Sequence, residues 1–405
     1  VNIQGYDVIK MLTWISLTGG IPAHAGKDSI AHIIFIKHEL PEIYERTYKF
    51  LEPKDYINLL LTGRFAASFD SICLHWLTDN RDITNVDYDP RLLRFAGIER
   101  EKLPDLMRSV EILGPLLPST ASELGLQAGI PVIVGTPDIH SAAIGSGAVR
   151  DCEPHLYIGT SSWLACHVPY KKTDLLHNIA SLPSAIPGRY LVTNEQECAG
   201  GCLTYLRDKI IYPHDSLSNG HMPEDVFMEF NKAAAEVPPG SQKVIFTPWL
   251  YGERTPVDDH AIRGGFFNQT LHTTRAHLIR AVFEGVAYNS RWLLKYVEKF
   301  VRRPMDKIRM VGGGANSDLW CQIHADVLNR IIVQVKEPVR VNLRGAAFLA
   351  GISLGVLDVD DIPNRVNIQR EYYPNQSNLP IYNQLFKEFV NLYHRTRPIY
   401  ARLNR

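Results

Sequence analysis

The chain has 405 residues, of which 45% are hydrophobic and 21% charged, and its 43 lysines and arginines balance 43 aspartates and glutamates. This composition is typical of a soluble globular protein with room for two or three domains. The neutral charge balance gives no sign of nucleic acid, an anionic membrane surface or an acidic protein as partner, and it favours a small-molecule ligand.

Neither a membrane span nor a secretion signal is expected from this sequence. No apolar run approaches the ~20 residues that cross a bilayer, and the N-terminal residues lack the basic and apolar blocks of a signal peptide. The six cysteines are scattered without the spacing of metal ligands. We therefore interpret them as reduced thiols and the protein as cytoplasmic.

The part of the chain before residue 100 is expected to be mainly helical. Apolar residues recur there at helical spacing, Asp28 and Pro41 suit the start of a helix, and Gly63 suits a helix end. The residues between the helices are polar or rich in proline. The expected helices cover residues 9–17, 29–37, 41–49, 56–61 and 90–96.

The stretch from Gly129 to Trp163 carries the residues on which the functional prediction depends. The apolar run 130–134 predicts a buried strand, and Asp138 follows it after a Gly-Thr-Pro turn. Residues 141–149 are small and would let a helix pack close to its neighbours. A second strand, 155–158, runs into a Gly-Thr-Ser-Ser turn. Because ligands bind at the carboxyl ends of strands in open α/β sheets, we expect the acid and the turn to lie at a ligand site.

Strands alternate with helices through the second half of the chain, which predicts an α/β domain whose sheet is at least partly parallel. We place a domain boundary near residues 149–154, where charged residues and a proline separate two apolar strands. The expected domains are therefore 1–150 and 151–405. The expected strands cover residues 190–193, 243–246, 307–311 and 331–335, and the expected helices cover 196–209, 275–300, 317–328, 344–354 and the tail from 382.

Two glycine-rich turns have both a functional and a structural interpretation. The turn Gly159–Ser162 can donate backbone N–H groups and hydroxyls to a phosphate, or it can be a simple turn. The turn Gly312–Ala315 leaves room for a pyrophosphate or a flat ring at a helix N-terminus, or it can be a tight connection. It does not have the GxGxxG pattern, so a dinucleotide fingerprint is not supported.

Several polar residues are equally ambiguous when each is taken alone. Asp138 can act as a general base, or it can cap the helix that follows it. The Glu253–Arg254 pair next to Gly252 can be a surface ion pair within a structural loop. His140 is of a residue type that is more often a satisfied polar group than a ligand.

The same structural interpretation applies to three further residues. His167 is expected to be a satisfied polar residue rather than a ligand. Cys198 and Cys202 are expected to share one face of a helix.

Taken together, the motifs resemble the FGGY family of carbohydrate kinases, with the greatest similarity to xylulokinases. An acid after one strand, a Gly-Thr-Ser turn after the next and a Gly-Gly-Gly-Ala turn a domain later match that family's layout. The resemblance extends over nearly the whole chain. The segments that carry it are PKDYINLLLTGRFAASFDS (53–71), GIPVIVGTPD (129–138), YIGTSSW (157–163), LYGERTP (250–256), FEGVAYNSRWLL (283–294), MVGGGANSDLWCQIHADVLN (310–329) and LRGAAFLAGISLG (343–355).

The resemblance implies an α/β, actin/hexokinase-like (ribonuclease H-like) fold of two domains with ATP and Mg²⁺ in the cleft between them. Residues 1–150 would be the remainder of the N-terminal, sugar-binding domain, and residues 151–405 the nucleotide-binding domain with a helical tail. The implied reaction is ATP-dependent phosphorylation of a sugar hydroxyl, and the expected acceptor is a ketopentose such as xylulose. A homodimer is one hypothesis for the assembly.

Carried over position by position, the resemblance makes Asp138 the general base that accepts the proton of the attacking hydroxyl. The implied sugar contacts are Asp138 and His140. The implied phosphate-binding residues are Gly159, Thr160 and Ser161. The other implied nucleotide contacts are Gly252, Gly313, Gly314, Ala315 and Ser317.

Two departures from the family pattern bear on the function. Xylulokinases typically have an asparagine after the aspartate, whereas this chain has Ile139 followed by His140, so the identity of the sugar stays open. The family's leading phosphate-binding motif, GxDxGT, does not occur in these residues. We therefore expect a first domain truncated at its N-terminus. The alternative function is a non-catalytic remnant that binds nucleotide or sugar, or that partners a full-length kinase.

Overall fold

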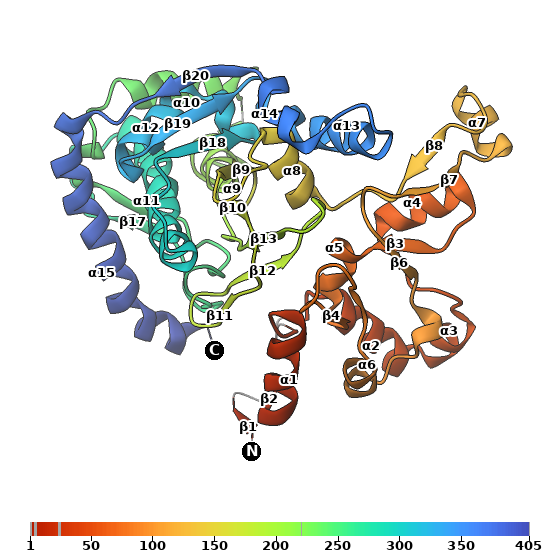
Figure 1. Ribbon diagram of the computed structural model, residues 1–405. Coiled ribbons are helices and arrows are strands. Elements are labelled where there is room, and N and C mark those ends of the chain that lie inside the picture. The colour runs from red at the N-terminus through yellow and green to blue at the C-terminus, as the bar shows by residue number, and fades with distance from the viewer. Residues whose placement is uncertain (1, 4–5, 23–25, 220, 405) are drawn as a thin grey trace.

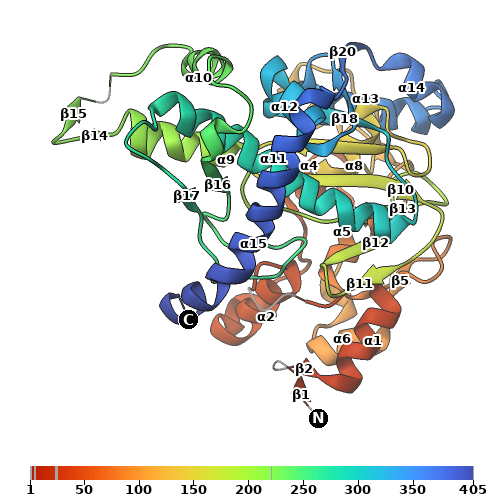
Figure 2. The same ribbon diagram turned by 90° about the vertical axis from the view of Figure 1, so that its left-hand side faces the viewer.

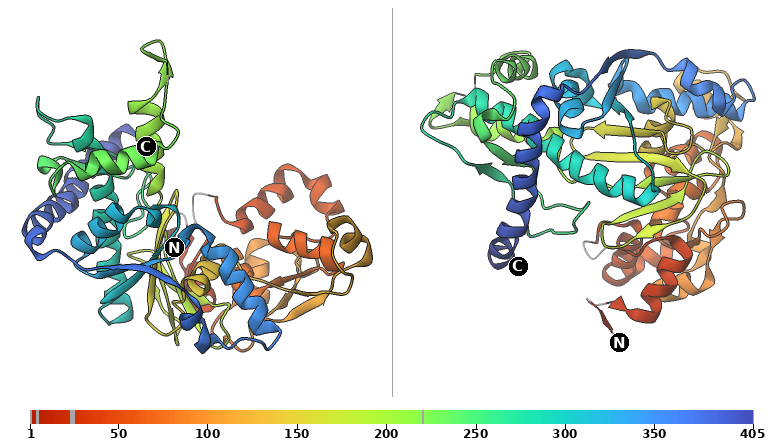
Figure 3. Two further views of the ribbon diagram at one scale, coloured as in Figure 1. Left: turned by 90° about the horizontal axis from the view of Figure 1, so that it is seen from above. Right: turned by 60° about the vertical axis from the view of Figure 1, so that its left-hand side comes forward.

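The computed structural model describes residues 2–3, 6–22, 26–219 and 221–404. Figure 1 shows two parts side by side: a smaller part coloured red to orange, and a larger, green-to-blue part built around one broad sheet. Each part has its own hydrophobic cluster, and the larger cluster belongs to the larger part. The view from above separates the two parts clearly (Figure 3).

An eight-stranded mixed sheet organises the larger part. Three neighbouring strands, β9 (Pro154–Ile158), β18 (Lys307–Val311) and β19 (Ile331–Val335), run parallel, and the other pairs are antiparallel. This confirms the prediction of a partly parallel sheet. The other strands are β10 (Ser162–Val168), β11 (Thr173–Asp174), β12 (Ile179–Pro183), β13 (Tyr190–Thr193) and β20 (Ile368–Tyr372).

Helix α11 (Arg275–Val301) confirms the helix expected at 275–300. Its apolar residues recur every three or four positions, so they form one stripe that can turn toward the core. Gly285 lets the helix approach β16 (Ile245–Thr247), because a Cβ there would lie 2.3 Å from the Phe246 carbonyl oxygen. The buried residues of the expected stripe are Ile279, Val282, Phe283, Val286 and Ala287.

Two glycines allow α8 (Asp138–Ser146) to cross α13 (Val341–Ser353) at very short range. A Cβ on Gly145 would lie 1.9 Å from the Val341 carbonyl oxygen, and a Cβ on Gly345 would lie 1.9 Å from the Ser141 carbonyl oxygen. This confirms the close packing expected from the small residues after Asp138. The crossing also fixes the start of α8, where Asp138 is the first residue.

The remaining helices of the larger part surround the sheet, and α15 runs along its outside (Figure 2). None of the helices in the described residues is long and apolar enough to span a membrane. These helices are α9 (Gly200–Tyr205) with its π-helical extension (Leu206–Ile211), α10 (Val226–Ala235), α12 (Asp318–Leu328), α14 (Ile362–Arg365) and α15 (Leu379–Leu403). The small strands are β14 (His214–Asp215), β15 (Ser218–Asn219) and β17 (Gly265–Phe267).

The smaller part consists of short helices and two-stranded pairs. Gly63 ends one helix in the left-handed conformation, with φ of 74°, as its residue type predicted. The helices are α1 (Val8–Thr18), α2 (Ser29–Glu39), α3 (Pro41–Arg46), α4 (Pro53–Thr62), α5 (Phe69–Ile72), α6 (Pro90–Ala96) and α7 (Pro118–Leu124). The strands are β1 (Asn2–Ile3), β2 (Tyr6–Asp7), β3 (Ala66–Ser68), β4 (Thr78–Asp79), β5 (Asp87–Tyr88), β6 (Asp105–Met107), β7 (Ile112–Pro115) and β8 (Pro131–Ile133).

The apolar run 130–134 is not the buried strand that its composition predicted. Strand β8 pairs only with β7 in the described residues, and Ile130 is 40% exposed. The acid and the Gly-Thr-Ser turn therefore do not follow neighbouring strands of one sheet. An apolar run indicates that a segment can be buried, but only the surrounding layers decide whether it is.

Residues 196–209 do not form the single helix that was expected. Helix α9 starts at Gly200, after a turn in which the Ala199 and Gly200 N–H groups donate to carbonyl oxygens of Thr160 and Gly159. These long-range hydrogen bonds override the local helical pattern. Cys198 consequently precedes the helix and does not share a helix face with Cys202. Asp28 occupies the N-cap position of α2, as its residue type predicted, although its side chain makes no capping hydrogen bond to the helix.

Candidate active site

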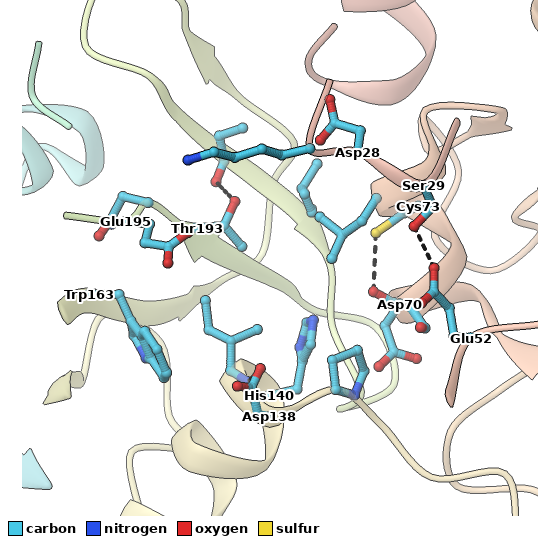
Figure 4. A pocket seen from close by; sticks show the side chains of 18 of the residues that line it. Asp28, Ser29, Glu52, Asp70, Cys73, Asp138, His140, Trp163, Thr193 and Glu195 are labelled. Atoms are coloured by element: carbon cyan, nitrogen blue, oxygen red, sulfur yellow. Dashed lines mark hydrogen bonds between the residues drawn. The ribbon is translucent and has the colours of Figure 1, made fainter. Parts of the chain in front are cut away.

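A cavity of about 900 Å³ opens between the two parts of the molecule. Residues from the 27–140 region line one side of it, and residues from the 163–255 region line the other. Figure 4 shows Asp138, His140 and Trp163 around this cavity. Asp138 and His140 are the two predicted site residues that line it, whereas the glycine turns lie outside its lining.

Asp138 lies at the first position of α8, and its side chain is exposed on the cavity wall. Pro137 occupies the N-cap position, and Asp138 Oδ1 accepts a hydrogen bond of 2.8 Å from the N–H of Ile139. The alternative that Asp138 is the N-cap is therefore wrong. Its Oδ2 accepts no hydrogen bond from the described residues, so this oxygen can receive a proton from a ligand.

Helix α4 holds the chain just before Asp138. The Asn58 Nδ2 and Lys54 Nζ groups both donate to the carbonyl oxygen of Val134, at 2.8 and 3.1 Å. The Lys54 ammonium group also contacts the carboxylate of Asp55. The backbone at Val134 is thus fixed by side chains that precede it by many residues in the sequence.

Two further contacts hold the next two residues of this loop. The N–H of Gly135 donates to the carbonyl oxygen of Ser109 at 3.0 Å, and Gly135 has φ of 75°, which glycine adopts without strain. The Thr136 hydroxyl donates to the carboxylate of Asp70, which is fully buried. Asp70 also lines the cavity.

His140 lines the cavity two residues after Asp138, with 2% of its surface exposed. Burial lowers the pKa of its imidazole below the usual 6.5, against the opposing effect of the Asp70 and Asp138 charges. The ring is therefore neutral at pH 7. Its Nδ1 has no hydrogen-bond partner among the described residues. A neutral imidazole can donate one hydrogen bond and accept another, which suits a ligand hydroxyl.

His167 is only in part the satisfied polar residue that was expected, because its Nε2 is buried without a hydrogen-bond partner among the described residues. His167 Nδ1 hydrogen-bonds the carbonyl oxygen of Ala148 at 3.0 Å, and burial lowers the pKa of this imidazole to about 3. All six cysteines are free thiols. Burial raises the pKa of the Cys202 thiol well above its usual range, so this group is an unreactive part of the core.

The two glycine turns lie side by side at the carboxyl ends of two parallel strands, β9 and β18, in the middle of the eight-stranded sheet. Because β9 and β18 are parallel neighbours, the turn after Ile158 lies beside the turn after Val311. A Cβ on Gly312, whose φ is 86°, would lie 2.6 Å from the Ile158 carbonyl oxygen, and a Cβ on Gly314 would lie 2.4 Å from Ile158 Cγ2. Gly313 has no neighbour within 4 Å at its Cβ position, so this side of the turn is open to a ligand.

The Gly159–Ser161 turn is held from behind by the residues before α9. The Gly200 N–H donates to the Gly159 carbonyl oxygen at 2.7 Å, and the Ala199 N–H donates to the Thr160 carbonyl oxygen at 2.8 Å. These bonds occupy carbonyl groups of the turn. The N–H groups of Thr160 and Ser161 make no hydrogen bond to the described residues, so they can serve an anion.

Three of the predicted nucleotide contacts have structural roles in the turns. Gly252 has φ of 81°, and a Cβ there would lie 2.9 Å from the Cα of His260. Ala315 is fully buried. Ser317 caps α12, because its hydroxyl oxygen accepts the Trp320 N–H at 3.0 Å. Their contact with a nucleotide stays a prediction.

Glu253 and Arg254 do not form the surface pair that the sequence suggested. Arg254 instead pairs with Glu195 and Glu197. Glu253 is 1% exposed and accepts a hydrogen bond of 2.6 Å from Asn289 Nδ2. Burial raises the pKa of Glu253 to about 7. The two side chains therefore have different partners, which adjacency in the sequence could not reveal.

The cavity has more acidic than basic groups on its walls. Each of its three cationic side chains has a carboxylate within 4 Å: Lys27 contacts Glu197, Lys54 contacts Asp55, and Arg254 contacts Glu195 and Glu197. The Lys27 contact joins the two parts of the molecule. The charged lining residues are Lys27, Lys54, Arg254, Asp28, Glu52, Asp70, Asp138 and Glu195.

Sequence reasoning missed several of these lining residues. Asp70 and Arg254 fall inside segments that carried the family resemblance, which was the one signal available for them. Glu195 had no such signal. Glu52 was also missed, and its hydrogen bond with His75 lowers the pKa of its carboxyl to about 2.

A mixed-sheet domain with two glycine turns is joined to a second part across a cavity with an exposed aspartate, which is the layout that the family resemblance implied. The chain belongs to the FGGY family of carbohydrate kinases. The N-terminal domain of that family matches residues 16–145, and its C-terminal domain matches residues 156–354. The predicted actin/hexokinase-like fold is thereby confirmed.

The relatives of this chain carry two different names. A xylulose kinase of Staphylococcus epidermidis is 28% identical over 387 residues, which are 93% of this chain and 73% of that protein. A gluconokinase of Bacillus subtilis is 28% identical over 395 residues, which are 96% of this chain and 74% of that protein. Similarity in sequence therefore does not select one acceptor.

Solved structures show the same division. A gluconate kinase from Lactobacillus acidophilus superposes with a TM-score of 0.84 at 25% identity, over 97% of this chain and 76% of that one. A xylulose kinase from the same species also gives a TM-score of 0.84, at 24% identity and with the same coverage, which shows the common fold.

Proposed function

We propose that this chain transfers a phosphoryl group from ATP to a sugar hydroxyl, with Asp138 as general base and a ketopentose such as xylulose as acceptor. Members of its family are carbohydrate kinases that use ATP. The observation that carries the role of Asp138 is its exposed carboxylate on the cavity wall, at the first residue of α8.

In this proposal Asp138 removes the hydroxyl proton as the sugar oxygen attacks the γ-phosphate. A general base must come within hydrogen-bond distance of the proton that it accepts, and Asp138 Oδ2 has no competing partner among the described residues. Phosphoryl transfer depends mainly on positioning and on stabilisation of charge. The carboxylate of Asp138, which follows a loop whose backbone is held in place, is therefore a sufficient base.

The nucleotide would bind in domain 151–405, where the two glycine turns meet, and the sugar would bind against domain 1–150. Thr160 and Ser161 offer N–H groups to a phosphate, and the open side of Gly313 leaves space for the nucleotide. In the described residues, no group of three or more His, Cys, Asp or Glu side chains converges as a metal site. Mg²⁺ therefore enters the proposal as part of the Mg-ATP substrate.

The charges of the cavity support a neutral acceptor over a sugar acid. A carboxylate such as that of gluconate would need a cation free to pair with it, and Lys27, Lys54 and Arg254 already contact carboxylates of the protein. The additional carboxylates of the lining would repel an anion. Hydroxyl groups of a ketose can instead hydrogen-bond to His140 and to these carboxylates.

The test is a coupled ADP-release assay with Mg-ATP and a panel of xylulose, other ketopentoses, ketohexoses, polyols and gluconate. We expect release that depends on xylulose and that falls by about 10²- to 10⁴-fold in Asp138→Asn, since general-base catalysis contributes that much. Release with gluconate alone would keep the kinase activity and reject the ketopentose. Absence of release from a folded sample that still binds ATP would favour the non-catalytic binding protein.

A further inference from the structure

A second carboxylate, that of Asp70, lies on the wall of the same cavity and has no assigned role. Asp70 belongs to α5, and its side chain is 0% exposed. No Lys, Arg or His of the described residues forms an ion pair with it. A buried charge without a cationic partner is unfavourable unless hydrogen bonds retain it. The hydrogen-bond donors to Asp70 therefore indicate what its carboxylate does.

Both oxygens of Asp70 accept hydrogen bonds from hydroxyl groups. Ser109 Oγ donates to Oδ1, and Thr136 Oγ1 donates to Oδ2. Ser109 also accepts the Gly135 N–H through its carbonyl oxygen at 3.0 Å. Asp70 and Ser109 thus fasten two successive residues of the loop that leads to Asp138.

We propose that Asp70 is a positioning residue for the general base, which holds Thr136 and thereby sets the position of the Asp138 carboxylate. The inference rests on the proposed role of Asp138 and names a further residue of that site. Only Pro137 separates Thr136 from Asp138, and its ring fixes φ, which is −63° here. A shift of Thr136 is therefore passed to Asp138 with little freedom to absorb it.

A double-mutant cycle in the full chain separates positioning from general stabilisation. Asp70→Asn and Thr136→Val should each lower kcat by about 10²-fold, the effect of a displacement of ~1 Å at a reacting group, and leave the KM for ATP unchanged. The double variant should lose no more kcat than Asp70→Asn alone, because Thr136→Val removes one of the two contacts that Asp70→Asn already perturbs. Thr136→Ser keeps the hydroxyl and should restore kcat.

Hydrogen exchange gives a readout that does not depend on turnover. In Asp70→Asn and Thr136→Val, the amides of Gly135 and Ile139, which are the two hydrogen-bonded amides of residues 135–139, should exchange at least about tenfold faster, because the loop opens locally once its contact is lost. Exchange elsewhere should be unchanged.

Asp326→Asn is the matched control for both measurements. Asp326 is a buried carboxylate of α12, outside the cavity lining, that accepts hydrogen bonds from Gln322, Asn375 and Asn378. This variant should lower Tm without altering kcat or exchange in residues 135–139.

Two results would overturn the inference. The first is an Asp70→Asn variant that behaves like Asp326→Asn, with a lower Tm but unchanged kcat and unchanged loop exchange. The second is a double variant in which the two losses of kcat multiply. If the unaltered chain releases no ADP with any sugar, the proposed function fails, and the hydrogen-exchange comparison still decides whether Asp70 positions the loop.

Discussion

The two ligand-facing regions of this molecule are built in different ways. At the carboxyl ends of two parallel strands, the turns after β9 and β18 are shaped by backbone contacts that only glycine permits, such as that of Gly312 with Ile158. At the cavity, the loop before Asp138 is held by side chains from α4 and α5, which are distant in the sequence. A site made of backbone leaves a local mark in the sequence, whereas a site made of side-chain contacts does not.

The largest effect on stability should come from the glycine turn after β18. Gly312→Ala should lower the free energy of unfolding by about 4 kcal/mol, because a positive φ and a clash with a carbonyl oxygen act together. Urea unfolding of the two proteins measures the difference. An unaltered midpoint would show that the turn can relax and that its close contact is not required.

Gly313→Ala is the neighbouring control for that experiment. Its Cβ would meet no atom within 4 Å, so the variant should unfold at the same urea concentration as the unaltered chain. If the open side of the turn faces the nucleotide, the KM for ATP should nevertheless rise. An unchanged KM would place the nucleotide elsewhere.

The burial of the Glu253 side chain should have an effect of similar size on the free energy of unfolding. Its pKa is raised from 4.5 to about 7, so ionisation costs the folded state stability. The stability contributed by the protonated Glu253 carboxyl group is fully present below pH 4.5 and is lost as the pH rises through the window from 4.5 to 7. The total loss is about 3 kcal/mol, from 1.36 kcal/mol for each unit of pKa shift.

Glu253→Gln should remove this dependence on pH. Urea unfolding of both proteins at pH 5 and pH 8 gives the comparison, and the unaltered chain should lose more stability between the two values. If both proteins lose the same free energy of unfolding between pH 5 and pH 8, the Glu253 carboxyl group is not perturbed by its burial.

A substitution at the crossing of α8 and α13 tests whether backbone packing also controls the position of Asp138 in the cavity. Gly345→Ala should lower the free energy of unfolding by about 2 kcal/mol, because its Cβ would meet the Ser141 carbonyl oxygen and push α8 away. Since Asp138 begins α8, kcat should fall as well.

Gly351→Ala lies in the same helix, and its nearest neighbour would be Leu357 Cβ at 3.3 Å. It should be tolerated or slightly stabilising, because alanine favours a helix. Equal losses in the two variants would show that the crossing is not specially tight.

The smallest effect is expected at the contact between the two parts. Lys27→Met removes the pair with Glu197, whose atoms are 3.3 Å apart, with the lysine side chain 41% exposed. The loss should stay below about 1 kcal/mol, and added salt should reduce it further because exposed ion pairs are screened. Thermal unfolding at low and high salt measures it. A larger effect that salt does not reduce would point to a role in holding the parts together.

Much of the fold was readable from local patterns. The helix at 275–301, the strands at 190–193, 307–311 and 331–335, and the small residues at the α8 crossing were all predicted near their observed positions. Each depends on a repeat or a residue type within a short window. The resemblance to the FGGY family was also carried by such windows, and the family match confirms it.

The tertiary structure alone decided which residues meet. It placed the run 130–134 in a two-stranded pair outside the large sheet, turned Arg254 toward Glu195 and Glu197, and brought Asp70 to Thr136. The sequence by itself determined the long helix, several strands, the glycine turns and the family, because these follow from neighbours along the chain. The burial of a strand and the partner of a charge depend on residues far away in the sequence, so only the packing of the whole chain could fix them.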